Sequence, residues 1–228
     1  MRGKRIFWSA ALIAVGAGLI ALGVLLFQDR RYNLISVLIA CAACVPFYTA
    51  YEKREGSIRR IVLLAVMVAM AAAGRFLFAF APGFKPVSAI VILTGVYMGQ
   101  EAGFLTGSLA ALISNMFYGQ GPWTPFQMMA WGMTGWMAGL PWLQPLLRKK
   151  LPLLLYGFLA GFLYSAVMDI WTVLSYEGEF LWSRYLAAMA TALPVTLEYA
   201  VSNVVFLMLL AGLIGRKLKR IQIRHGIF

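Results

Sequence analysis

Residues 88–117 read SAIVILTGVYMGQEAGFLTGSLAALISNMF, an apolar stretch interrupted near its middle by Gln100-Glu101. A single helix over this stretch would be about 45 Å long and would bury Glu101 near the centre of a bilayer. If the stretch is two helices, the first is only about 18 Å long, which is short for a hydrocarbon core of roughly 30 Å. The number of crossings, and therefore which loops share a side, depends on this break.

The positive charges decide between the two arrangements. Fifteen of the 20 Lys and Arg residues gather in four patches that flank hydrophobic runs: Arg2, Lys4, Arg5; Lys53, Arg54, Arg59, Arg60; Arg148, Lys149, Lys150; and Arg216, Lys217, Lys219, Arg220, Arg224. With a break at Gln100-Glu101 the two sides carry 15 and 4 basic residues, whereas without it they carry 8 and 11. Because cytoplasmic loops are rich in Lys and Arg, we predict the break, eight crossings and two cytoplasmic termini.

The composition of the whole chain indicates a membrane protein. Of its 228 residues 62% are apolar or aromatic and only 12% are charged, against about half and about a quarter in soluble domains. These values exclude a soluble enzyme, a disulfide scaffold and a disordered chain. A net charge of +12 would suit nucleic acid, but no segment outside the membrane is long enough to form a basic surface. The patches fit anionic lipid headgroups instead, so we expect a multi-pass protein in the lipid bilayer with no nucleic-acid partner.

The hydrophobic runs give the order of the expected helices. They are 7–27, 32–51, 58–80, the two halves of 88–117, 126–143, 151–176 and 185–214. We therefore predict an all-α polytopic fold: an N-terminal transmembrane helix pair in residues 1–56, followed by a six-helix membrane domain in 57–228. Loops 81–87, 118–125 and 177–184 then face the outside together. Glycines four residues apart, as in Gly103/Gly107 and Gly135/Gly139, predict close packing between helices.

An enzyme is the first functional class to test. The only histidine is His225, and the sequence contains no HExxH, GxSxG or Walker motif,. Asp169 and Glu198 lie in separate predicted helices and could perform acid–base chemistry on a lipid or isoprenoid substrate, which remains the enzymatic alternative. A purely structural role for the polar residues is the other alternative. We expect no catalytic residue and no metal site.

Polar and aromatic residues gather near the predicted outer helix ends. Arg75 is an ionisable residue within a helix, and such residues face a cavity or pair with a partner, here Asp169 or Glu198. Trp and Tyr at a membrane interface often belong to the aromatic belt, but aromatic faces mixed with amides also line small-molecule pockets. The candidate binding residues are Arg75, Lys85, Asn115, Tyr118, Gln120, Trp123, Gln127, Trp131, Asp169, Trp171 and Tyr176.

The stretch from Gly74 to Gly139 also carries a family resemblance. Its elements are Gly74-Arg75, Pro82-Gly-Phe-Lys-Pro86, Gly103-Phe-Leu-Thr-Gly107, Ser114-Asn115, Gly119-Gln-Gly-Pro-Trp-Thr-Pro-Phe-Gln127 and Trp131-Gly132. Together they resemble the substrate-binding S component of an energy-coupling factor (ECF) vitamin transporter. The resemblance covers roughly residues 57–228, whereas the N-terminal helix pair departs from the six-helix pattern of that family.

The resemblance implies a function and partners. An S component of the bacterial cell membrane binds a vitamin or related micronutrient at the outer face and associates with a membrane T component and two cytoplasmic ATPases. This chain would then need no cofactor, because its partners use the ATP. Ala65, Ala69 and Ala73 match the alanine row that meets the T component. The Gly-Pro-Trp-Thr-Pro loop resembles the subtype linked to cobalamin or another corrinoid, while the residue types also suit riboflavin or another heteroaromatic vitamin.

Overall fold

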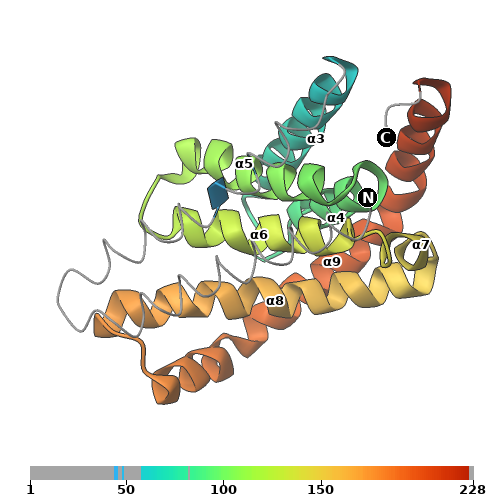
Figure 1. The fold of residues 1–228 in the computed structure, drawn as a ribbon. Coiled ribbons are helices and arrows are strands. Elements are labelled where there is room, and N and C mark those ends of the chain that lie inside the picture. Colours follow the sequence, from blue (N-terminus) through green and yellow to red (C-terminus); the bar gives the residue numbers. More distant parts are fainter. Residues whose placement is uncertain (1–43, 46–47, 49–57, 82, 226–228) are drawn as a thin grey trace.

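A computed structural model describes residues 44–45, 48, 58–81 and 83–225 of the chain. Within these ranges the chain is helical, with no strand, as the sequence predicted (Figure 1). The helices are α3 (Ile58–Leu77), α4 (Val87–Met98), α5 (Gln100–Tyr118), α6 (Thr124–Ala138), α7 (Gln144–Leu147), α8 (Lys150–Glu177) and α9 (Trp182–His225). The expected crossing at 7–27, and all but residues 44, 45 and 48 of the one at 32–51, lie outside the described residues.

Three of the helices are long and apolar enough to cross a membrane. They are α3, α8 and the Trp182–Ile221 part of α9, and α4 is a shorter apolar helix. The expectation of membrane-type helices is therefore confirmed for the described part of the chain. Whether the whole chain crosses the bilayer eight times stays a prediction.

The predicted break within 88–117 is present, but it lies at Gly99 rather than at Gln100-Glu101. Gly99 joins α4 to α5 with φ 96° and ψ 170°, a conformation that residues with a side chain rarely adopt. Gly95 and Gly103, four residues to either side, lie so close that a methyl group on Gly103 would come within 2.8 Å of the Gly95 Cα. The chain therefore reverses at Gly99, and the backbone of the glycine makes the turn.

Helix α4 occupies the centre of the bundle. All of its residues except Tyr97 are buried, as expected for a helix that is apolar on every side. It packs against α3, α5, α6 and α9. At its carboxyl end Tyr97 lies 5.9 Å from the Arg148 guanidinium and beside Gly215. The basic patches that begin at Arg148 and Arg216 therefore lie at one end of the bundle, in agreement with the predicted charge asymmetry.

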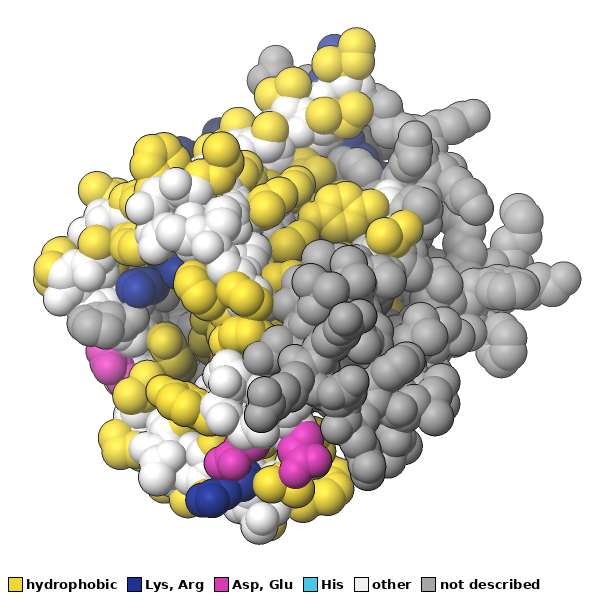
Figure 2. All heavy atoms as spheres, turned by 90° about the vertical axis from the view of Figure 1, so that its left-hand side faces the viewer, with side chains coloured by type: hydrophobic (Ala, Val, Ile, Leu, Met, Phe, Trp, Pro, Cys, Tyr) yellow, Lys and Arg dark blue, Asp and Glu magenta, His cyan; other side chains and the backbone are white. Residues whose placement is uncertain are grey.

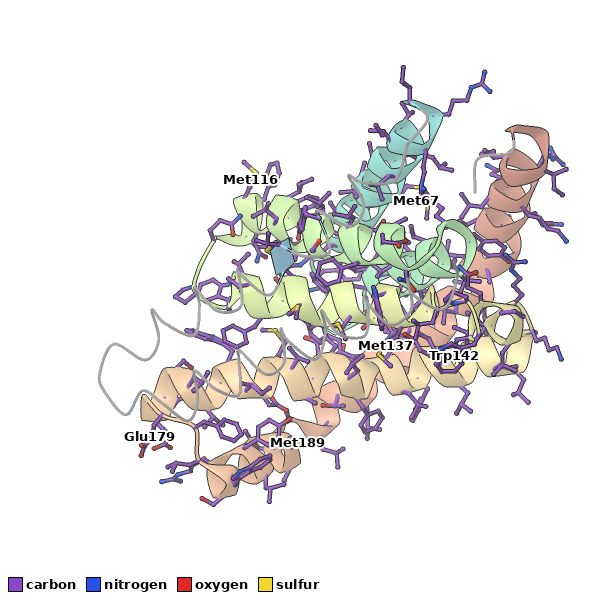
Figure 3. All side chains as sticks on the ribbon, in the orientation of Figure 1. Met67, Met116, Met137, Trp142, Glu179 and Met189 are labelled. Carbon is purple, nitrogen blue, oxygen red and sulfur yellow. The ribbon has the colours of Figure 1, made fainter. Side chains whose placement is uncertain are left out.

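Helices α5, α6 and α8 run side by side across the bundle (Figure 1). Met116 near the end of α5 and Glu179 after α8 mark one end, while Trp142 after α6 marks the other (Figure 3). Glycines permit the closest approach, because a methyl group on Gly107 would overlap the Trp131 backbone.

Two helix ends and one bend have local causes. Helix α6 stops at Ala138, earlier than the predicted 143, because Pro141 has no N–H to continue the helix,. Helix α8 ends at Gly178, whose φ of 77° forms a left-handed cap,. Helix α9 carries Pro194 in its interior and changes direction along its length (Figure 1), since proline removes a helical hydrogen bond.

Candidate ligand-binding site

Arg75 lies near the carboxyl end of α3 and contacts side chains of α5 and α6. Its Nη1 atom donates to Ser114 Oγ and Asn115 Oδ1, each at 2.6 Å. The guanidinium carbon lies 4.6 Å from the ring centre of Tyr118 and 5.3 Å from that of Trp131, within the range of cation–π attraction. The Tyr118 hydroxyl in turn donates to the Arg75 carbonyl at 2.8 Å. Hydrogen bonds and two aromatic rings therefore fix the plane of the guanidinium.

Asn115 links Arg75 to a chain of buried polar side chains. Its Nδ2 atom donates to Gln127 Oε1 at 2.8 Å and to Thr124 Oγ1 at 3.1 Å. Gln127 Nε2 then donates to the Tyr164 hydroxyl at 2.9 Å. This network joins α3, α5, α6 and α8. Because buried polar groups are costly when unpaired, a network bonded at each member holds its side chains in one arrangement.

Aromatic contacts extend the network to α9. The rings of Trp131 and Tyr164 stack with their centres 5.1 Å apart. Tyr164 also meets Tyr199 of α9 edge to face at 5.1 Å. Aromatic pairs in these two geometries stabilise a packed core beyond the area that they bury.

Helix α9 holds the loop that carries Lys85. Glu198 Oε1 accepts from the Gly83 N–H at 3.1 Å. One turn later, Ser202 Oγ accepts from the Lys85 N–H at 2.9 Å and donates to the Lys85 carbonyl at 3.2 Å. With its backbone held in this way, Lys85 places its ammonium 5.9 Å from the Tyr118 ring centre. Burial lowers the pKa of Lys85 from 10.5, the charge of Arg75 lowers it further, and Glu198 partly offsets both.

The solvent exposure of the side chains increases from the base of the site to its rim. Asn115 is fully buried and Gln127 is 6% exposed, whereas Tyr118 is 41% and Trp123 is 37% exposed. Figure 2 shows the end of the molecule at which α5 is followed by α6 and α8 by α9; hydrophobic side chains cover much of its described surface, with basic and acidic groups between them. A ligand that reached Arg75 would approach across the exposed aromatic rim.

The structure brings together six of the predicted site residues. They are Arg75, Lys85, Asn115, Tyr118, Gln127 and Trp131, and with Tyr164 we call them the Arg75 cluster. Gln120 lies beside it, accepting from Thr124 Oγ1 at 3.0 Å and donating to the Leu112 carbonyl at 2.8 Å. Trp123 packs over Gly121 in the same loop.

Three predicted residues have their contacts elsewhere. Trp171 packs on Phe126 at 5.5 Å, Tyr176 is 84% exposed, and Asp169 is buried on α8. The alternative in which Arg75 pairs with Asp169 or Glu198 is not formed in the described part of the chain, where Arg75 contacts only neutral groups. Among the described residues, no group of three or more His, Cys, Asp or Glu is placed to hold a metal ion.

Sequence reasoning missed several residues that build the site. Ser202 follows Glu198 by four residues, and this spacing on one helix face could have indicated a shared partner. Tyr164, Tyr199 and Thr124 gave no such signal, because a tyrosine in an apolar helix or a threonine at a helix start has many other roles. Their part in the site depends on which helices meet.

The alanine row of α3 lies away from the buried side of that helix. Ala65, Ala69 and Ala73 are exposed, whereas Leu64, Val68 and Ala72 beside them are buried. The same exposed face carries larger apolar side chains: Val62, Val66 and Met70. One side of α3 therefore belongs to the bundle, and the other presents an apolar surface on which alanines lie among larger side chains.

Comparison with known proteins places the chain in a family. The chain belongs to DUF6580, a family of unknown function, which matches residues 56–221. No curated protein and no solved structure matches the chain. The matched region contains the Arg75 cluster and nearly all of α3 to α9, and it leaves out the N-terminal helix pair predicted from the sequence.

Proposed function

We propose that the chain is the substrate-binding membrane subunit of an ECF-type importer. One observation supports this most directly: the Arg75 cluster, which side chains from several helices build at one end of the bundle. A charged group, amides and exposed aromatic faces are the residue types that bind small molecules. In this proposal the chain crosses a bacterial cell membrane eight times with both termini in the cytoplasm, so that the cluster faces outward.

The proposal includes partners and a substrate class. A membrane T component and two ATPases would supply the energy, since the sequence carries no nucleotide-binding motif of its own. The substrate is a vitamin or related micronutrient, with a corrinoid favoured by the sequence resemblance. Riboflavin or another heteroaromatic vitamin fits the aromatic faces of the cluster.

The binding function can be tested on the full chain. We expect protein purified with native lipids to retain a small molecule that mass spectrometry detects, and the Trp131→Ala variant to lose it, because Trp131 packs on both Arg75 and Tyr164. The control is Trp142→Ala, since Trp142 is 67% exposed at the other end of the bundle. Equal retention by both variants, or no retained molecule in the wild type, would contradict the binding function.

The partner surface has its own test. We expect Ala69→Trp to remove the T component from proteins that co-purify with the chain, because a large side chain would prevent close approach of a partner helix to the alanine row. The control is Leu155→Trp, at a position of α8 that is 59% exposed. Small-molecule binding should survive in both variants. Unchanged co-purification of Ala69→Trp would show that the row is not the interface.

A further inference from the structure

Two cationic side chains of the Arg75 cluster share one aromatic ring and lack a close carboxylate. Arg75 and Lys85 lie 4.6 and 5.9 Å from the ring centre of Tyr118. Neither forms an ion pair within the described ranges. The carboxylate of Glu198 acts on Lys85 from a distance, and its Oε1 accepts from the Gly83 N–H. The result is a local excess of positive charge at a partly buried place.

Another arginine at this end of the helix bundle has the usual acidic partner. Arg184 is 62% exposed, and its Nε atom lies 3.1 Å from Glu177 Oε1. The exposed arginine thus has a carboxylate partner, although water would screen its charge in any case. Arg75 is less exposed, so an opposite charge would stabilise it more. The depressed pKa of Lys85 has the same physical origin, since burial and Arg75 both disfavour its protonated form.

The hydrogen-bonding pattern of Arg75 identifies the donors that remain. Both described hydrogen bonds of its side chain use Nη1. The Nε and Nη2 atoms have no hydrogen-bond partner among the described residues, and neither does Lys85 Nζ. Nε and Nη2 form one edge of the guanidinium, and this edge matches the two oxygens of a carboxylate or phosphate. Ser114, Asn115, Tyr118 and Trp131 hold the guanidinium from its other sides, so the edge is fixed before a ligand arrives.

We infer that the ligand of this site is an anion whose carboxylate or phosphate group binds the Nε–Nη2 edge of Arg75, with Lys85 Nζ as a second contact. This inference rests on the proposed binding function and narrows its substrate class to acids. Tyr118, 41% exposed, offers an aromatic surface beside the anion. A neutral ligand would leave Arg75 without an ion-pair partner and Lys85 with only the partial compensation that Glu198 gives.

Binding of acids and their neutral amides tests the inference. The full chain is placed in nanodiscs of phosphatidylcholine, and calorimetry measures binding of nicotinate against nicotinamide, benzoate against benzamide, and inorganic phosphate. We expect at least one acid to bind about tenfold or more tightly than its amide, a difference of about 1.4 kcal/mol. Arg75→Gln should abolish this preference, Lys85→Gln should reduce it, and Arg75→Lys should retain part of it. Arg184→Gln, which removes a paired cation, should leave it unchanged.

The possible outcomes separate this inference from the proposed function. If no acid binds, or if acids and amides bind equally and Arg75→Gln changes neither, the anion assignment is overturned, while retention of a small molecule would still support a binding subunit. Thermal unfolding of each variant shows whether a lost preference reflects lost folding, and Lys85→Gln keeps the test valid if Arg75→Gln does not fold.

A lipid headgroup could supply the same anionic group. The measurement is therefore repeated in nanodiscs that contain phosphatidylglycerol. If this lipid blocks the acids and remains bound in an Arg75-dependent way, the anion site is upheld, but its ligand is a lipid and the importer function fails. If acids still bind, the ligand is a soluble anion and both proposals stand.

Discussion

Helices α5 and α6 meet in two different ways along their length. In one half, Gly103 lies against Gly135 and Gly107 against the Trp131 backbone, and the ring of Phe104 packs against Gly132. In the other half, Asn115 and Gln127 fill the same interface with hydrogen-bonded amides. The first arrangement consists of close backbone and apolar contacts, and the second of hydrogen bonds between amide side chains. One helix pair therefore provides both a rigid base and a site that can recognise a ligand.

The largest effect on stability is expected from a larger side chain in the glycine half of the contact between α5 and α6. Gly103→Leu should prevent the folded protein from forming, because its side chain would overlap the Gly135 backbone and no flexible group there can move aside. We expect a loss above about 3 kcal/mol, beyond the usual cost of overpacking. Size-exclusion chromatography and thermal unfolding in detergent measure the result.

Gly212→Leu is the matched control for this change. Gly212 lies in α9, and a Cβ added there would meet no atom within 4 Å. Replacing an exposed helical glycine should be neutral or slightly stabilising. Equal stability of the Gly103 and Gly212 variants would show that the glycine half of the contact between α5 and α6 has room for a side chain.

A smaller effect is expected in the polar half. Asn115→Ala should destabilise the protein by about 2 kcal/mol, because it removes one partner of Arg75 and leaves Gln127 Oε1 without its donor,. The midpoint of unfolding in denaturant measures the change. Gln120→Ala, which removes an exposed amide from the neighbouring loop, should alter stability by less than about 0.5 kcal/mol. A matching loss in both variants would mean that the buried network gives no special stability.

The smallest effect concerns the pH dependence of acid binding. Lys85 has a pKa below 10.5 in the empty site, and a bound anion favours its protonated form. Affinity for nicotinate should therefore be complete below the lowered pKa and decline by about threefold to tenfold as the pH rises through it. Lys85→Arg should bind with a flatter profile, because arginine keeps its proton throughout this range. Identical profiles for the two proteins would exclude Lys85 from the anion contact.

The break between α4 and α5 shows which feature of the fold the sequence predicts and which it does not. Counting basic residues predicted that 88–117 must reverse, because the positive-inside rule concerns the side of the membrane on which each whole loop lies. The count could not place the turn, and the polar pair Gln100-Glu101 suggested a position one residue too late. The backbone of Gly99 makes the reversal, since a glycine can adopt a positive φ at little cost.

The candidate site shows the same division. The helix ends and loops that approach one another followed from alternating membrane crossings, which is why Arg75, Asn115, Tyr118 and Gln127 could be grouped from the sequence. The pairing of Arg75 with an acidic residue was an equally reasonable expectation. The rotation of each helix about its axis decides which side chains face Arg75, and a linear sequence does not give that rotation. Tyr164 and Ser202 became part of the site only through the packing of α8 and α9.

The sequence by itself determined that this is a helical membrane-type protein with a polar, aromatic end, because apolar run length and charge position are properties of the chain in one dimension. The tertiary structure alone decided that Arg75 is held by neutral groups with one edge left over, and that Lys85 stands beside it. Hydrogen bonds and ring contacts reach only a few ångströms, so they depend on the rotation and spacing of helices. In this protein the rotation and spacing of the helices depend on the glycines at which two backbones come into contact.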